Sequence, residues 1–214
     1  MSLLDRRRFL QSSVAFSAAA SAGMALADGS GSLPPDGYFQ LDRFVVDLDL
    51  DDGVAVSRAA RRAGLEVSEV RGDMSRLWYD DLDYAWRKSP MVLPGVTAPE
   101  GLFVLETLAL DRGMRVMYRG EHGPSADQDE FHQLRGPRQV VAPILECLAA
   151  SATADATGAA IVQALMRCPI GRQPTDTARA GNRMTGAAAV TAADRELVTW
   201  LIAPKTLGTA VAAA

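Results

Sequence analysis

The sequence has few of the residues from which metal sites and nucleic-acid surfaces are built. Its 214 residues include two cysteines and two histidines. A four-ligand zinc site would use all four of them and leave none for another role. Lysine occurs only at Lys88 and Lys205 and the formal net charge is −4, so the basic surface of a general nucleic-acid-binding protein is missing. The motifs CxxCH, GxSxG and HExxH are also missing. No sequence motif therefore indicates an activity or identifies a cofactor.

The composition is that of a folded globular protein. Hydrophobic residues make up 48% of the chain and charged residues 22%, which excludes a disordered or collagen-like polymer. Beyond the N-terminal segment, the length is that of one domain.

The first 27 residues have a basic start, an uncharged middle and a small-residue end. Arg6 and Arg7 are followed, after one position, by Phe9 and Leu10, and this pattern resembles a twin-arginine export signal. The resemblance implies recognition by the twin-arginine translocase and a periplasmic location. The small residues that end the segment at Ala27 are typical of a peptidase site, so we expect cleavage there.

An uncleaved anchor is the alternative for this segment. Phe9 to Ala27 is 19 residues without a charge, close to the ~20 that span a bilayer. If the signal is removed, no stable membrane anchor is expected. Because the periplasm is oxidising, Cys147 and Cys168 are interpreted as a disulfide, with two buried free thiols as the alternative.

The rest of the chain is interpreted as three consecutive parts. Residues 28–40 contain glycine, serine and proline and are expected to be a flexible lead-in. Residues 41–137 alternate between strand-like and helix-like segments, with strands near 44–50, 65–70, 91–93 and 114–118 and helices near 54–63, 74–88 and 99–112. This alternation predicts an α/β fold, a small Rossmann-like or flavodoxin-like parallel sheet of about four strands with helices on both faces.

The third part, residues 138–214, is rich in alanine and is interpreted as a helical appendage on the same domain. Helices are expected near 140–148 and 161–166, and a last one from Thr191 through Leu201. The polar stretch 121–138, with two Gly-Pro pairs, is interpreted as a long loop before it.

The ends of the predicted strands are the first places to look for a site, since ligands of open parallel sheets bind there. Asp47 and Asp49 are two residues apart on one strand, which places both side chains on one face. The spacing resembles the first motif of haloacid-dehalogenase-like phosphatases. That resemblance implies that Asp47 is the nucleophile and Asp49 the acid/base, with magnesium. An edge strand with a polar face is the alternative.

Two further strand ends carry candidate ligand-binding residues. Thr97 and Glu100 lie in a strand-to-helix turn whose free N–H groups could hold an anion, although an ordinary capped helix start has the same appearance. Glu121 and His122 begin a group of potential metal ligands or general bases that would suit a divalent ion. A solvated acidic loop is the alternative for this group, which continues with Asp127, Asp129, Glu130 and His132.

The segment from Arg71 to His122 contains Leu77-Trp78-Tyr79, Trp86-Arg87 and the run Leu102 to Glu106. In these residues it is similar to uncharacterised twin-arginine-signal proteins of proteobacteria, which implies a shared domain and no activity. We therefore expect a non-catalytic periplasmic accessory subunit or small-ligand-binding module, with a larger cofactor-containing oxidoreductase as partner. The alternative is a small metal-assisted hydrolase, phosphatase-like, that uses the strand-end acids and histidine.

Overall fold

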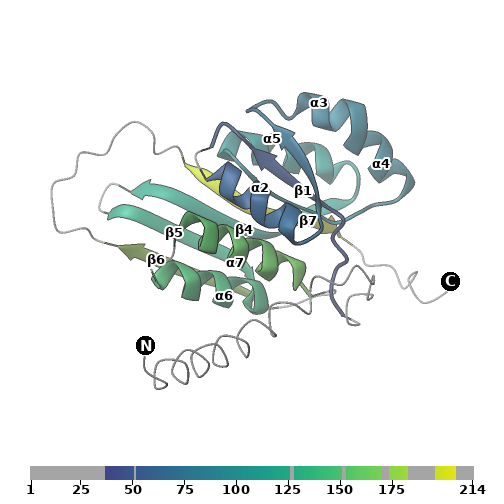
Figure 1. Cartoon of the computed structure of the whole chain (residues 1–214). Helices are drawn as coiled ribbons and strands as arrows, with labels where there is room; N and C mark the ends of the chain where they lie inside the picture. The colour runs from purple at the N-terminus through teal and green to yellow at the C-terminus, as the bar shows by residue number, and fades with distance from the viewer. Residues whose placement is uncertain are drawn as a thin grey trace, which may run out of the picture. The chain divides into compact units, whose positions relative to one another are not determined.

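The computed structural model describes residues 37–50, 52–125, 128–150, 153–169, 174–182 and 196–205. In these stretches one mixed sheet is covered by helices on both faces (Figure 1). The proposed export signal 1–27, with Arg6, Arg7, Phe9 and Leu10, lies outside the described residues. Of the helices in the described stretches, none has the length and apolar character needed to cross a membrane.

The sheet has seven strands in the order β2-β1-β3-β7-β4-β5-β6. The first three strands are mutually parallel, and every later pairing is antiparallel. The last strand of the chain therefore lies between the third and the fourth. The strands are β1 (Arg43–Asp47), β2 (Glu66–Val70), β3 (Leu93–Thr97), β4 (Met114–Ser125), β5 (Gln128–Pro137), β6 (Thr175–Asn182) and β7 (Leu197–Pro204).

Helices from different parts of the chain cover each face. One face carries α2 (Gly53–Arg62), α6 (Arg138–Ala149) and α7 (Ala154–Met166). The other carries α5 (Pro99–Leu110) and a second helical segment, in which α3 (Ser75–Leu77) continues through the π-helical turn η2 (Trp78–Leu82) into α4 (Asp83–Lys88). Figure 1 shows both sets, with α2, α6 and α7 on the near side of the sheet.

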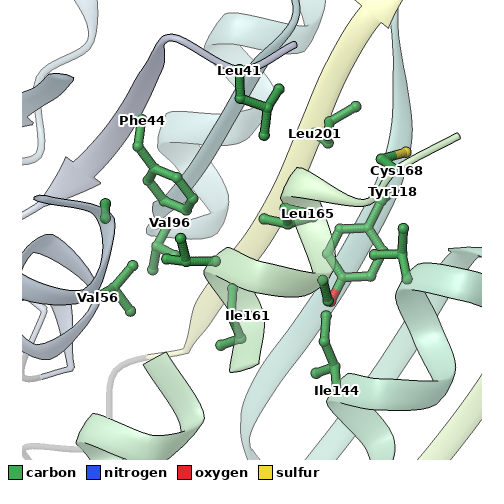
Figure 2. Close-up of a cluster of buried hydrophobic side chains, with 14 of the residues drawn as sticks. Leu41, Phe44, Val56, Val96, Tyr118, Ile144, Ile161, Leu165, Cys168 and Leu201 are labelled. Atoms are coloured by element: carbon green, nitrogen blue, oxygen red, sulfur yellow. The ribbon is translucent and has the colours of Figure 1, made fainter. Parts of the chain in front are cut away.

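Each face has its own hydrophobic cluster. Under α2, α6 and α7, Phe44 and Tyr118 of the sheet pack with Ile144, Ile161 and Leu165 of the helices (Figure 2). The opposite cluster contains all three tryptophans of the chain. Burying each large apolar side chain stabilises the fold by about 1.5–3 kcal/mol, so both helix layers are held firmly to the sheet.

The first half of the chain folds largely as its pattern predicts. The expected α/β alternation is present from β1 to β4, and helices cover both faces of the sheet. Gly64 and Gly113 follow α2 and α5 with φ of +82° and +70°, a conformation that glycine adopts at helix ends. Within the predicted lead-in, Tyr38 forms a bridge with Pro169 and the Phe39 N–H donates to the Cys168 carbonyl.

The prediction of a long loop at 121–138 is wrong. β4 extends to Ser125 and pairs with β5 as an antiparallel hairpin. In β5 the buried His132, Leu134 and Gly136 alternate with the less buried Phe131, Gln133 and Arg135, which is the period of a strand. Two features hid this alternation: polar residues occur in loops as well as in strands with one solvated face, and Gly-Pro pairs are typical of loops.

The prediction of a helical appendage at 138–214 is correct only for α6 and α7. Residues 175–182 and 197–204 are strands of the same sheet, so the sheet is larger than four strands and mixed rather than parallel. The expected helix through Leu201 is wrong because β7 is a central strand, buried at six of its eight positions. A strand that is apolar on both faces shows no alternation and can be mistaken for a helix segment.

Candidate functional site

A β-bulge in β4 determines which side chains face α6 and α7. Val116 pairs with Ile202 of β7 and Tyr118 pairs with Leu201, so Met117 is an extra residue between two consecutive pairs. The extra residue reverses the alternation of the strand. Met114 and Val116 therefore pack on the α5 side, whereas Tyr118 faces the opposite side. Gly120 and His122 follow Tyr118 by two and four residues and face the same side as Tyr118.

The bulge brings four polar side chains into one buried row across three strands. Thr199 of β7 lies opposite Gly120, and its Oγ1 is 3.0 Å from the Tyr118 hydroxyl and 3.0 Å from His122 Nε2. His122 also lies opposite His132 of β5, and their Nδ1 atoms are 2.9 Å apart. We call Tyr118, Thr199, His122 and His132 the polar row.

Burial keeps two members of the polar row uncharged. Loss of solvation lowers the pKa of His122 to about 3, with a smaller contribution from the neighbouring His132. Burial also raises the pKa of Tyr118, against the opposing effect of its hydrogen bond to Thr199. His122 is therefore a neutral imidazole at physiological pH, with one ring nitrogen that donates and one that accepts.

The hydrogen bonds of the row are consistent in two tautomeric arrangements. In one, His122 donates from Nε2 to Thr199 and accepts at Nδ1 from His132. In the other, the Thr199 hydroxyl donates to His122 Nε2, and His122 donates from Nδ1 to His132. Moving from one to the other changes His132 Nε2 from an acceptor into a donor.

Gly120 leaves the space in which the row is assembled. A Cβ at this position would lie within 3.0 Å of Thr199 Oγ1, the Tyr118 hydroxyl and His122 Nε2. Because backbone or side-chain atoms have to move to relieve such contacts, glycine is required here for steric reasons rather than for its backbone conformation.

A cavity of about 200 Å³ lies beside the two histidines, between the sheet and the N-terminal turns of α2 and α7. We call it the histidine cavity. Its polar lining consists of Asp52, His122, His132, Thr157 and Thr199. Its apolar lining consists of Val56, Val96, Leu148, Ala154, Gly158, Ile161 and Leu197. A mostly apolar cavity with a few convergent polar groups is the usual form of a small-molecule site.

A second cavity, of about 500 Å³, lies at the carboxyl ends of β1 and β3 and is lined by Asp47, Asp49, Gly72 and Glu100, among others. We call it the strand-end crevice. The structure thus brings together three of the residues expected at strand ends. Asp47 Oδ1 accepts the N–H groups of Asp49 and Gly72 at 3.0 and 3.1 Å, and Arg71 pairs with Asp49 at 3.2 Å. These bonds give Asp47 a role in holding the loops after β1 and β2.

Thr97 and Glu121 line neither the histidine cavity nor the strand-end crevice. Thr97 is fully buried, and its hydroxyl accepts the Trp200 indole N–H at 3.0 Å. Glu121 pairs with Arg119 at 2.9 Å, and Arg119 in turn lies 3.6 Å from Glu106 of α5. Glu121 is therefore oriented toward the α5 side of the sheet and does not line the histidine cavity, although it lines a third cavity, of about 230 Å³, together with His122.

Of the expected group of metal ligands, the structure brings His122 and His132 together. Asp127 and the side chains of Asp129 and Glu130 lie outside what the structure describes. Among the described side chains, no set of three or more His, Cys, Asp or Glu is placed to hold a metal ion.

Cys147 and Cys168 are free thiols in the structure, the alternative to the expected disulfide. Cys147 lies half-buried on α6, and Cys168 is buried after α7. Burial raises the pKa of the Cys168 thiol to about 12, so this residue is a poor nucleophile near neutral pH.

Tyr118 and Thr199 were not anticipated as site residues. Thr199 lies on the strand that resembles a helix in sequence, and Tyr118 reaches this face only because of the bulge at Met117. A signal for the histidine pair did exist, since His122 and His132 lie opposite each other and are equally distant in sequence from position 127.

Comparisons with protein-family models, with curated proteins and with solved structures found no match to this chain.

Proposed function

We propose that this protein is an exported periplasmic module that binds a small molecule in the histidine cavity and serves as accessory subunit to a larger oxidoreductase carried by the twin-arginine route. The N-terminal pattern around Arg6 and Arg7 supports export. The histidine cavity supports ligand binding, and it is the observation that carries the proposal.

The cavity suits a small molecule that has an apolar part and a polar part. Val56, Ile161 and Leu197 supply apolar walls from α2, α7 and β7. The histidine pair supplies ring nitrogens at one end, where Thr199 holds His122 and His122 contacts His132. In the two tautomeric arrangements the ring nitrogens of the pair exchange donor and acceptor roles, so a ligand that favours one arrangement fixes the protons of the whole row.

Native mass spectrometry of the protein purified gently from the periplasm of its own host tests this function. We expect a retained small molecule, a second polypeptide, or both. Thr157→Phe should abolish retention of the small molecule, because Thr157 lines the cavity and a phenyl ring there occupies its space. A bare monomer that takes up no small molecule would refute the binding function.

Thr107→Phe is the matched control. Thr107 is an exposed residue of α5, on the opposite side of the sheet, and is not part of the cavity lining. The same change of residue should leave retention unaffected there. Equal loss in both variants would mean that the effect comes from aggregation or misfolding rather than from filling the cavity.

A metal-assisted hydrolase is the second candidate, and the strand-end crevice favours it. The order β2-β1-β3 supports a flavodoxin-like half, in which the strand order reverses between β1 and β3. Asp47, Asp49 and Glu100 share the crevice at that point. Magnesium-dependent hydrolysis of p-nitrophenyl phosphate should then be lost in Asp49→Asn and kept in Asp42→Asn, an exposed acid just before β1. Absence of hydrolysis in the unaltered protein would remove this candidate.

A further inference from the structure

The only two histidines in the chain meet at a single point. They are ten residues apart in sequence and lie directly opposite each other on β4 and β5. Their Nδ1 atoms face each other at 2.9 Å, and each residue is only 8% exposed. A protein with so few imidazoles thus places both of them in one buried site, beside a cavity that can admit a further ligand.

The surroundings orient His122 in the way that metal-binding histidines are oriented. A ligating imidazole typically donates its second N–H to a fixed acceptor, which sets the tautomer and the direction of the other nitrogen. Thr199 Oγ1, 3.0 Å from His122 Nε2, is such an acceptor, and its own hydroxyl can donate to the Gly120 carbonyl at 3.5 Å. In this arrangement the lone pair of His122 Nδ1 points at His132.

We propose that His122 and His132 bind a divalent first-row transition-metal ion, with Zn²⁺ as the representative, through their two Nδ1 atoms. Imidazole nitrogen is a preferred ligand of these ions. Two nitrogens at 2.0–2.1 Å from a tetrahedral zinc are about 3.3–3.4 Å apart. The observed 2.9 Å therefore has to widen by about 0.4–0.5 Å. Both rings also have to turn, because at a tetrahedral zinc each lone pair points about 35° away from the line that joins the two nitrogens.

Binding changes the tautomer of His132 by moving one proton within its ring. His132 moves its proton from Nδ1 to Nε2, which frees the second lone pair, and His122 keeps its proton on Nε2.

The remaining coordination positions belong to water or to a molecule in the histidine cavity. In this respect the inference rests on the proposed function, since the same cavity holds the ligand. The metal limits the ligands of this cavity to small molecules that have an oxygen or nitrogen atom able to complete its coordination. Two protein ligands leave more open positions than the single one of most catalytic zinc sites.

A Zn²⁺ titration of the full-length protein, labelled with ¹⁵N at histidine and carrying no histidine tag, tests the site. Only two imidazoles contribute signals, and the spectrum of His132→Gln assigns the remaining ring to His122. We expect one equivalent of Zn²⁺ to shift the Nδ1 resonances of both rings. Saturation without any change at Nδ1, or no saturable binding, would overturn the proposal.

Variants separate the histidine pair from other binding sites for zinc. His122→Gln and His132→Gln should each abolish binding, while Thr199→Val should weaken it about 10-fold by removing the acceptor for His122. Asp49→Asn and Glu100→Gln, in the strand-end crevice, should leave the affinity unchanged. If the crevice variants lose zinc and the histidine variants keep it, the assignment is wrong. The measurements on the unaltered protein stand even if a histidine variant fails to fold.

Failure of this inference differs from failure of the proposed function. A protein that retains an organic molecule but binds no Zn²⁺ at the histidines keeps the cavity function and loses the metal site. In the opposite case, the histidines bind Zn²⁺ but neither the unaltered protein nor Thr157→Phe retains an organic molecule. The metal site is then kept and the proposed function is lost.

Discussion

Replacing Thr199 with valine removes the hydroxyl in the middle of the polar row and keeps the shape of the side chain. In the unaltered protein, Thr199 Oγ1 is 3.0 Å from both the Tyr118 hydroxyl and His122 Nε2. Both of these groups are buried, so each loses a partner in Thr199→Val. The variant therefore tests whether the row is held together by hydrogen bonds or only by packing.

The size of the effect follows from the number of groups left without a partner. Each buried polar group that loses its partner costs about 1–3 kcal/mol, so Thr199→Val should lower the free energy of unfolding by about 2–6 kcal/mol. Tyr118→Phe should lower it by only about 0.5–1.5 kcal/mol, since Thr199 keeps His122 and the Gly120 carbonyl as partners. In the double variant only His122 loses a partner, at a cost of about 1–3 kcal/mol.

The double variant is therefore expected to be more stable than Thr199→Val alone. Urea unfolding followed by tryptophan fluorescence measures all four proteins, because all three tryptophans are buried. Independent effects would instead make the double variant less stable than either single one. That additive result would refute the hydrogen-bonded row, whereas partial or full rescue of Thr199→Val by Tyr118→Phe would establish the coupling.

Three further predictions follow from the same region. Gly120→Ala should destabilise the fold by more than Tyr118→Phe, because its Cβ lies within 3.0 Å of three atoms of the row; thermal unfolding with equal Tm values would contradict this. His122 takes up a proton near pH 6.5 in the unfolded chain and only near pH 3 in the folded protein. The free energy of unfolding should therefore fall by about 2 kcal/mol from pH 7.5 to 5.0. This fall should be absent in His122→Gln. In the native protein, iodoacetamide should label Cys147 before Cys168, because Cys168 is buried and its thiol has a pKa of about 12. In urea it should label both cysteines. A mass lower by two hydrogens, measured without reduction, would instead show a disulfide.

The part of the fold that the sequence predicts well is the part in which local patterns and tertiary environment agree. α2 and α5 end where Gly64 and Gly113 follow them, and β1 is a short apolar run between turn residues. Asp47, Asp49 and Glu100 could be placed at one edge because parallel strands end on the same side of a sheet. These inferences needed no knowledge of distant pairings.

The polar row could not be predicted because it depends on two features that no local pattern shows. A bulge at Met117 decides that Tyr118 and His122 face α7, and one residue fewer would turn both toward α5. The partner strand β7 resembles a helix in sequence because both of its faces are buried. The histidine pair alone had a visible signal, the symmetric spacing about a hairpin turn, and the Gly-Pro pairs nearby favoured a loop instead.

The strand order links the site to completion of the fold. The chain leaves β3 through α5 and returns as β4, but these two strands do not pair, and the space between them is filled only by β7. Thr199, which orients His122, comes from that last strand, and Trp200 beside it donates to Thr97 of β3. Residues 197–204 therefore supply both the central strand of the sheet and the hydroxyl group that holds His122 in the polar row. Until they are inserted, β3 and β4 have unpaired edges and His122 lacks its partner, so a polar row with its histidine cavity exists only in the fully folded chain, the form that the proposed export route would carry.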